Sequence, residues 1–259
     1  MKTINTLLVI AMRDLTKLLR DRPRILASLI FPFVFIGILG NSLNSNLSAD
    51  VGFSFLTFVF VGVVGQNLFQ STASGIISLI EDRENDFSQS MFIAPVSRYT
   101  IILGKIIGES LVAMVQLLGI IVIGLVFQIP FTWLQIVSMV IMIPVVTLLG
   151  GAFGTLVMAN LTNQKQANMI FPFLMFPQFF LSGVFSPIKN LPVYLMVLSR
   201  ISPMTYAVDL MRSVYYAGSP IYDKVVLHSV GTNLLVVGIM TVVMVTLGTV
   251  MFVRNEKNR

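Results

Sequence analysis

Long apolar runs separated by short polar breaks make up most of this chain. Six runs reach or approach the roughly 20 residues that a helix needs to cross about 30 Å of hydrocarbon. They are Ile25–Leu43, Phe53–Ile80, Ile101–Phe127, Leu134–Ala159, Ala167–Pro187 and Ser229–Val253. Lipid offers backbone polar groups no partners, and no alternating ten-residue pattern indicates a barrel, so helices are expected. The pattern predicts an all-α membrane protein with six transmembrane helices in a single transmembrane domain, residues 1–259.

The distribution of lysine and arginine predicts how these spans are oriented. With six spans, one side of the membrane holds both termini and the loops 81–100 and 160–166, and it carries 13 of the 17 basic residues. The other side carries only Lys189, Arg200, Arg212 and Lys224. Because cytoplasmic loops are enriched in basic residues, we expect a multi-pass protein of the cytoplasmic (inner) membrane with cytoplasmic N- and C-termini.

Three stretches depart from a plain span. Residues 5–22 place apolar side chains near one helical face and charged ones mostly on the other, which predicts an interfacial helix. The expected apolar face is Leu7, Leu8, Ala11, Leu15, Leu18 and Leu19, and the expected polar face is Arg13, Asp14, Lys17, Arg20 and Asp21. The fifth span contains Pro172 and Pro177 and then Gly183 and Pro187, which predicts a proline-broken span, because proline removes a helix hydrogen bond. Residues 189–218 remain half apolar and predict short cap helices on the extracellular face.

Composition argues against catalysis by this chain alone. It has no cysteine, a single histidine, and no HExxH, GxSxG or GxxxxGK[ST] motif. We therefore expect no catalytic residue, no metal site and no cofactor bound by this chain, and we interpret His228 as an ordinary interfacial residue. The net charge of +6 comes from basic residues that flank apolar segments, so membrane topology explains it better than nucleic-acid binding does.

One charged pair lies within an expected span. Glu109 follows Lys105 by one helical turn, so the two side chains share a face of the third span. Charges inside spans are rare and usually functional. Two interpretations stay open: a snorkelling pair that orients the span, or a role in gating or cation coupling.

Uncharged polar residues and glycines mark further helix contacts. The amides Gln66, Asn67 and Gln70 in the second span need partners in hydrocarbon, so they form interhelical hydrogen bonds or line a substrate path. The small-residue motifs GKIIG (104–108) and GGAFG (150–154) allow close helix approach, and we favour internal packing over a dimer contact.

The most polar break in the chain follows the second span. No charged residue occurs from Val51 to Ile80, and then five of the six residues from Glu81 to Asp86 are charged. Phe87, Met91 and Ala94 recur at helical spacing beside these acids. A charge run is often only a solvated loop, but this spacing favours a short helix over residues 81–95.

This break and two other segments resemble the type-2 ABC exporter permeases, most closely the drug-export members. The intracellular-loop motif is matched by Glu81, Arg83, Pro95, Ser97, Arg98, Gly104 and Lys105, although Asn85-Asp86 stand where many members carry Gly-Thr. A second segment, 179–216, matches at Ser182, Gly183, Pro187, Pro192, Pro203, Thr205, Tyr206, Asp209 and Arg212. The third is LLRDRPR followed by FPFVF near the N-terminus.

The resemblance implies a partner and a substrate path. Residues 81–95 would be a cytoplasmic coupling helix seated in a separate ABC ATPase subunit, which binds the ATP and Mg. Its contacts would come from Glu81, Asp82, Arg83, Glu84, Asp86, Phe87, Met91, Phe92, Pro95 and Arg98. A homodimer with two ATPase subunits is implied, with the first, second and fifth spans bordering the path. Path residues would be Phe33, Phe60, Gln66, Asn67, Gln70, Phe176, Gln178 and Phe180.

The expected function is therefore that of the membrane subunit of an ATP-driven exporter for a hydrophobic or amphipathic, drug- or lipid-like substrate. Export of polysaccharide or teichoic-acid precursors uses the same architecture and stays open. An ATPase-independent ion channel or carrier is the other alternative. It predicts rings of polar residues in the spans or repeat symmetry between the halves, and the sequence has neither.

Overall fold

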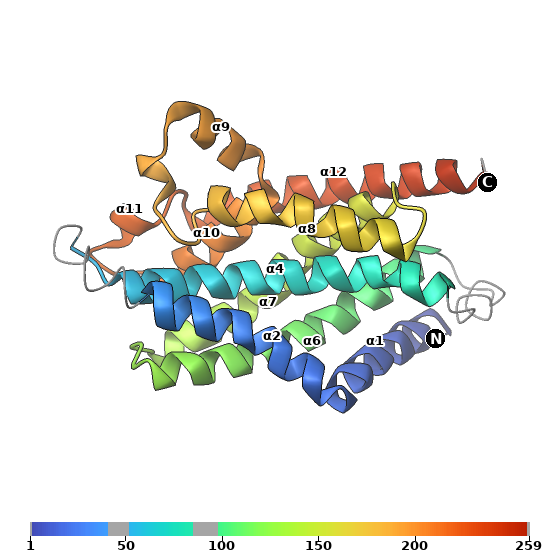
Figure 1. Ribbon diagram of the computed structural model, residues 1–259. Coiled ribbons are helices and arrows are strands. Elements are labelled where there is room, and N and C mark those ends of the chain that lie inside the picture. The colour runs from blue at the N-terminus through green and yellow to red at the C-terminus, as the bar shows by residue number, and fades with distance from the viewer. Residues whose placement is uncertain (1, 41–51, 85–97, 258–259) are drawn as a thin grey trace.

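The computed structural model describes residues 2–40, 52–84 and 98–257, and every regular element among them is helical (Figure 1). The α-helices are α1 (Lys2–Arg20), α2 (Arg22–Val34), α4 (Phe55–Glu84), α6 (Arg98–Val126), α7 (Trp133–Met158), α8 (Gln164–Leu181), α9 (Val193–Ile201), α10 (Pro203–Tyr215), α11 (Tyr222–Val225) and α12 (Val230–Lys257). A π-helix, η1 (Phe35–Gly40), continues α2, and a 3-10 turn, η2 (Ile188–Asn190), precedes α9. The prediction of an all-helical chain is confirmed for the described residues.

Four segments of the described chain are long and apolar enough to cross a membrane. They are Phe55–Ile80 in α4, Gly104–Val126 in α6, Trp133–Met158 in α7 and Tyr222–Met251, which takes in α11 and most of α12. The predicted first span is a shorter apolar segment, Ser28–Ile38, and the predicted fifth span is the 18-residue α8. The chain is a multi-pass membrane protein, while the count of six spans stays a prediction.

The predicted break in the fifth span is displaced from its prolines. α8 runs without interruption from Gln164 to Leu181 and contains both Pro172 and Pro177. The chain leaves the helix at Ser182 and turns at Gly183, whose φ of +74° is favourable only for glycine. A proline deletes one backbone hydrogen bond, but the turns on either side of it can keep the helix continuous. The predicted span is therefore interrupted at Gly183, inside its bounds Ala167–Pro187, and a break at Pro172 or Pro177 is excluded.

The central element of the bundle is α4. Within its membrane segment 78% of the residues are buried, compared with 17% in the segment that includes α12. A Cβ at Gly150 would lie 2.3 Å from the carbonyl oxygen of Phe69, and one at Gly154 would lie 2.6 Å from that of Ala73. The small residues of GGAFG therefore let α7 approach the backbone of α4, which is the internal packing that we favoured from the sequence.

The predicted cap region contains η2, α9 and α10, but α10 does more than cover an end of the bundle. Every residue of α10 is buried, and Cβ atoms at Gly62 and Gly65 would lie within about 3 Å of the α10 residues Arg212 and Val208, respectively. Gly62 and Gly65 lie two to three helical turns inside the membrane segment of α4. The helix therefore enters the bundle beside α4, which the apolar and proline content alone did not indicate.

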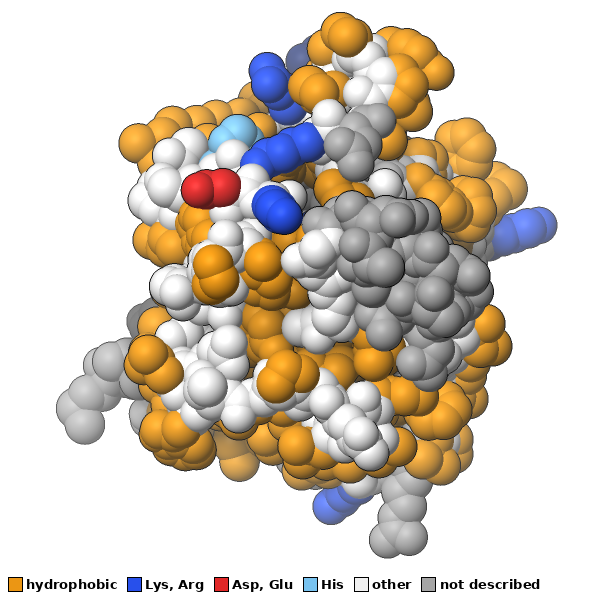
Figure 2. Space-filling view, turned by 90° about the vertical axis from the view of Figure 1, so that its left-hand side faces the viewer, with side chains coloured by type: hydrophobic (Ala, Val, Ile, Leu, Met, Phe, Trp, Pro, Cys, Tyr) orange, Lys and Arg blue, Asp and Glu red, His pale blue; other side chains and the backbone are white. Residues whose placement is uncertain are grey.

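The long helices run side by side, and the short ones gather at one end (Figure 1). The start of α1 and the end of α12 lie together at the right-hand end of this view, and α9, α10 and α11 lie toward the left. Figure 2 looks onto the left-hand end, where the charged side chains gather mainly in one area among hydrophobic and neutral ones. Both termini thus share one end of the bundle.

Candidate functional site

A polar pocket of about 390 Å³ lies among helices that are otherwise strongly apolar. Its lining comes from α2 (Ser28, Phe31), α4 (Gln66, Asn67, Gln70, Ser71, Ser74), α6 (Gln116) and α8 (Phe179). We call it the amide pocket. It brings together the three amides of the second predicted span, and it draws on the first, second, third and fifth spans.

The α4 side of the amide pocket follows from helical spacing. Asn67, Gln70, Ser71 and Ser74 stand at positions i, i+3, i+4 and i+7, so they form one stripe along the helix. Their helix is apolar on its other faces, where the buried residues of the largest hydrophobic core lie. A polar stripe on a central helix directs hydrogen-bonding groups toward one place inside the bundle.

Several polar atoms of the amide pocket lack partners. The side-chain amide of Gln66 donates to Oε1 of Gln70 over 2.8 Å. The oxygens Gln66 Oε1, Asn67 Oδ1 and Gln116 Oε1 are buried without a hydrogen-bond partner among the described residues. Gln66 is only 1% exposed. Since burying such a group without a partner is costly, these atoms mark a place where a bound molecule would gain hydrogen bonds.

Aromatic rings form the rim of the amide pocket. The rings of Phe31 and Phe179, on α2 and α8, have centroids 5.4 Å apart. Phe35 continues this contact against Phe185 at 5.0 Å. The pocket therefore offers apolar ring faces next to uncharged hydrogen-bonding groups, which suits an amphipathic molecule.

The structure does not bring all the predicted path residues to this pocket. Phe60 is fully buried against Phe131, and Gln178 accepts a hydrogen bond from the hydroxyl of Ser202 over 3.1 Å. These two side chains serve internal packing in the described structure. Phe33, Phe176 and Phe180 are exposed on the surface of the chain and line no part of the amide pocket.

A buried ion cluster lies where α1, α4 and α6 meet. The ammonium of Lys105 is 3.0 Å from Oδ2 of Asp14 and 3.2 Å from Oε1 of Glu109. All three side chains are at most 4% exposed. Asp14 was expected on the polar face of the interfacial helix, and that expectation is wrong, because the carboxylate faces inward to meet Lys105. The pair predicted from the sequence is thus a trio that joins α1 to α6.

Glycines allow the helices of this ion cluster to meet. A Cβ at Gly108 would lie 3.0 Å from both Ala11 Cα and Asp14 Oδ2, so α1 crosses α6 at the GKIIG motif. A Cβ at Gly75 would overlap the carboxyl group of Glu109. The Glu109 side chain therefore crosses directly over α4, one residue beyond the polar stripe that ends at Ser74. In the described part of the chain, no group of three or more His, Cys, Asp or Glu residues could hold a metal ion.

The segment 179–216 contains residues that tie the short helices to the bundle. Arg212 on α10 donates to the carbonyl oxygens of Gly183, at 2.6 Å, and Val184, at 3.1 Å. Its guanidinium also lies 3.6 Å from the centre of the Phe58 ring. Arg212 thus joins α10 to the turn that follows α8 and to α4.

Asp209 binds the chain that leads into α12. Its two carboxylate oxygens accept the backbone N–H groups of Leu227 and His228, at 2.8 and 2.9 Å, and Oδ2 also accepts the side-chain amide of Asn233. Such charge-assisted bonds fix the start of the helix. Asp209 and Arg212 thus hold the architecture in place rather than line the amide pocket.

The predicted coupling residues lie almost wholly outside the described part. Residues 81–84 form the last turn of α4, so the backbone of the charged break begins as a continuation of this helix. Residues 85–97 lie outside the described residues, and Arg98 begins α6. The docking role of residues 81–95 stays a prediction.

Sequence reasoning missed part of the amide pocket, although a signal was present. Gln116 is the only amide side chain in the membrane segment of α6, and the argument used for Gln66 applies to it equally. Ser71 and Ser74 extend the α4 stripe at helical spacing. The contributions of Ser28 and Phe179 had no comparable signal, because they depend on how α2 and α8 pack.

Comparison with known proteins agrees with this architecture. A model of the ABC-2 type transporter family matches residues 5–216, a range that contains both the amide pocket and the buried ion cluster. The protein named Probable multidrug ABC transporter permease YbhR, from Escherichia coli (strain K12), is 31% identical over 142 residues. The protein of that name from Escherichia coli O157:H7 gives the same values. The aligned stretch is 54% of this chain and 38% of either relative, so the chain spans well under half of their length.

The family match covers most of the chain, and it includes the three segments whose motifs we interpreted from the sequence. It confirms the resemblance to type-2 ABC permeases on which the expected partner and path were based. The chain belongs to the ABC-2 type transporter family.

Proposed function

We propose that this chain is the membrane subunit of an ATP-driven ABC exporter that moves a hydrophobic or amphipathic compound out of the cytoplasm. Membership of the ABC-2 type transporter family supports the role of membrane subunit. Two relatives are named as probable multidrug ABC transporter permeases, which supports the proposed kind of substrate. The chain would not be an enzyme by itself. A separate ABC ATPase subunit would bind ATP and Mg and hydrolyse the nucleotide.

The amide pocket is the observation that carries this proposal. It combines ring faces with uncharged amides and hydroxyls inside a membrane bundle, and it contains no acidic or basic side chain. An amphipathic molecule could place an apolar part against Phe31 and Phe179 and satisfy the amide oxygens with its polar part. An ion channel would instead call for a ring of polar groups around a pore.

The path from pocket to motor would run along α4. This helix carries the amides of the pocket, passes Glu109 at Gly75, and ends in the charged residues 81–84. Its 30 residues make a rigid element about 45 Å long. Movement of a partner at the coupling segment 81–95 would thus reach the amide pocket through one helix, and Lys105 and Glu109 would act as a gating or coupling contact beside it.

The assembly would contain two copies of this chain and two ATPase subunits in the cytoplasmic membrane. The positions of both termini at one end of the bundle support their common placement on the cytoplasmic side (Figure 1). The proposed outward end would carry α9 and α11, with fewer basic residues than the other end.

Transport by reconstituted vesicles tests the proposal. We would measure ATP-dependent drug accumulation with the chain and its ATPase, comparing Gln66→Leu and Asn67→Leu with Asn168→Leu, an exposed amide at the start of α8. Loss of one hydrogen bond worth about 1 kcal/mol should weaken substrate affinity roughly fivefold. Because Asn67 Oδ1 has no partner among the described residues, Asn67→Leu should keep the thermal stability while transport falls, whereas Gln66→Leu also removes the hydrogen bond to Gln70.

Two results would overturn the proposal. If both pocket variants transport as well as the Asn168→Leu control, the amide pocket does not bind the substrate. If the chain alone moves its substrate in vesicles without ATPase or nucleotide, it is a carrier or channel and not an exporter subunit.

A further inference from the structure

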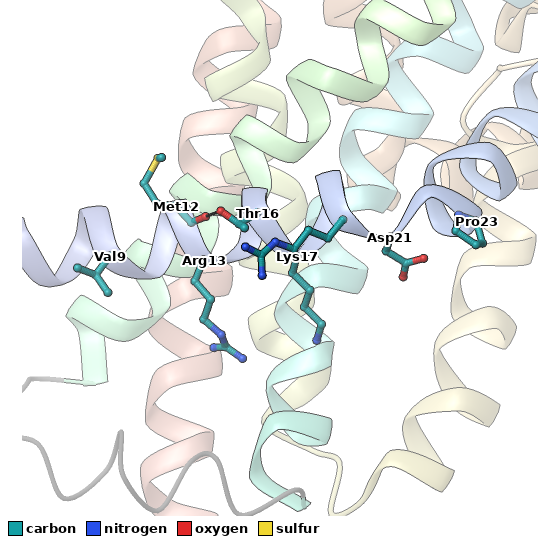
Figure 3. Close-up of a pocket in the computed structure, with 8 residues that line it drawn as sticks. Val9, Met12, Arg13, Thr16, Lys17, Asp21 and Pro23 are labelled. Carbon is teal, nitrogen blue, oxygen red and sulfur yellow. Dashed lines mark hydrogen bonds between the residues drawn. The ribbon is translucent and has the colours of Figure 1, made fainter.

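The outward face of α1 carries a basic surface hollow that the transport proposal leaves unused (Figure 3). It is lined by Val9, Met12, Arg13, Thr16, Lys17, Arg20, Asp21 and Pro23 and has a volume of about 820 Å³. We call it the α1 hollow. The opposite face of the same helix buries Ile10, Ala11, Asp14 and Leu18 against the bundle.

The basic residues of the α1 hollow follow from the helical repeat. Arg13, Lys17 and Arg20 stand at positions i, i+4 and i+7. Figure 3 shows that the side chains of Arg13 and Lys17 leave α1 on the same side. Among the described residues that line the hollow, three are basic, Arg13, Lys17 and Arg20, and one is acidic, Asp21. Asp14, on the inward face of α1, contacts Lys105 and does not line the hollow.

The depth of α1 follows from its contact with α6. A Cβ at Gly104 would lie 3.2 Å from Ile10, and Gly104 is the first residue of the membrane segment of α6. α1 therefore crosses α6 within the first turns of an apolar run that begins at Ile101, which is near the level of lipid headgroups. At Asp21 the helix ends, and α2 continues from Arg22 into the bundle. In Figure 3, α1 crosses the direction of the longer helices around it.

We propose that the α1 hollow binds the phosphate headgroup of an anionic phospholipid from the adjacent leaflet. Arg13, Lys17 and Arg20 would contact the phosphate oxygens, and Arg can do so with two parallel hydrogen bonds. Val9 and Met12 are 68% and 56% exposed, and they would lie against the first methylenes of the acyl chains. A free phosphate ion would gain nothing from this apolar margin, whereas a phospholipid satisfies both kinds of surface. This inference does not depend on the transport function.

Lipid binding by the purified chain tests the inference. Phosphatidylglycerol and phosphatidylcholine would be titrated separately into the detergent-solubilised protein, with retained lipid counted by native mass spectrometry. The variant Arg13→Gln/Lys17→Gln/Arg20→Gln is compared with Lys165→Gln/Lys224→Gln/Arg254→Gln, which removes the same charge from three other exposed sites. Each basic residue near an anionic lipid surface raises the binding constant roughly fivefold. Loss of three such residues should therefore make the α1 variant bind phosphatidylglycerol about a hundredfold more weakly at low salt. The control should stay within about twofold of the wild type.

The outcomes separate the alternatives. Equal weakening in the two triple variants would show a general charge effect and overturn the inference, and so would equal binding of phosphatidylcholine. Competition by glycerol 3-phosphate at the concentration effective for the lipid would identify a soluble phosphate site instead. Should the α1 triple variant keep its lipid but lose the ATPase subunit, the hollow is a protein-docking surface. If that variant does not fold, Lys17→Gln alone decides, because its side chain is exposed: an unchanged phosphatidylglycerol affinity refutes the site.

Discussion

Replacing Lys105 by methionine should destabilise the protein strongly, because it removes the only cation of the buried ion cluster. The ammonium lies 3.0 Å from Asp14 and 3.2 Å from Glu109, and all three side chains are at most 4% exposed. In Lys105→Met the two carboxylates would face each other in a place with little water. Each then loses the ammonium that both contact and must stay charged or take up a proton, and both outcomes cost free energy.

The size of the effect follows from the burial of the cluster. Breaking a buried ion pair by removing one partner costs roughly 3–5 kcal/mol. A change of 1 kcal/mol shifts the unfolding temperature of a chain of this size by roughly 2–4 °C. We therefore expect Lys105→Met to unfold at a temperature roughly 6–20 °C below that of the wild type. The measurement is the fraction of monodisperse protein after heating in detergent.

Two variants make this experiment specific. Lys165→Met removes an exposed lysine on α8, and its unfolding temperature should match that of the wild type. The neutral combination Lys105→Met/Asp14→Asn/Glu109→Gln should recover most of the lost stability, because it leaves no buried charge. If Lys105→Met unfolds within about 2 °C of the wild type, or if the neutral combination is no better, the ion cluster does not hold α1 against α6 as described.

Three further predictions follow from other contacts. Gly150→Ala should lower the free energy of unfolding in detergent by about 1–3 kcal/mol, because the added Cβ would lie 2.3 Å from a carbonyl oxygen of α4. In the control Gly238→Ala the added Cβ meets nothing within 4 Å, so this variant should unfold at no lower temperature than the wild type. If Gly150→Ala and Gly238→Ala lose the same free energy of unfolding, α4 and α7 do not cross as closely as described. Arg212→Leu should lower the free energy of unfolding by on the order of 3–5 kcal/mol, because it leaves buried carbonyl groups unpaired. The control Arg200→Leu changes an exposed side chain and should alter the free energy of unfolding by no more than about 0.5 kcal/mol. Similar unfolding temperatures of the two variants would refute this prediction. Phe92→Glu should abolish substrate-stimulated ATPase activity in the reconstituted complex while the protein still inserts, and unimpaired stimulation would count against docking through residues 81–95.

Hydrophobic patterning predicted the long helices well, and it failed where helix ends depend on packing. α4, α6, α7 and α12 lie where apolar runs of sufficient length predicted them, because lipid leaves backbone groups no partner except their own helix. In α8 the helix continues through Pro172 and Pro177, and the chain turns only at Gly183, near the end of the predicted span. A proline removes one backbone hydrogen bond, but the residue at which a helix ends also depends on the contacts that the following residues can make.

In the amide pocket, too, the sequence identified some residues correctly, whereas helix packing determined the contacts of others. Gln66, Asn67 and Gln70 were candidates from sequence because amides are costly in hydrocarbon, and they do line one cavity. Phe60 and Gln178 were candidates from the resemblance, and they are taken up by packing and by Ser202. Composition identifies groups that need a partner, but it does not say whether the partner is another helix or a ligand.

The sequence predicted a helical membrane protein whose two termini lie at the same end of the bundle, and it identified the amides Gln66, Asn67 and Gln70 on α4 as side chains that need partners. Each of these follows from local periodicity and from the cost of burying polar groups in lipid. Helix packing placed Asp14 against Lys105, brought α10 beside Gly62 and Gly65, and enclosed one polar pocket among four helices. These features depend on contacts between residues far apart in the chain, and helical spacing places a side chain on a face without stating what that face will meet.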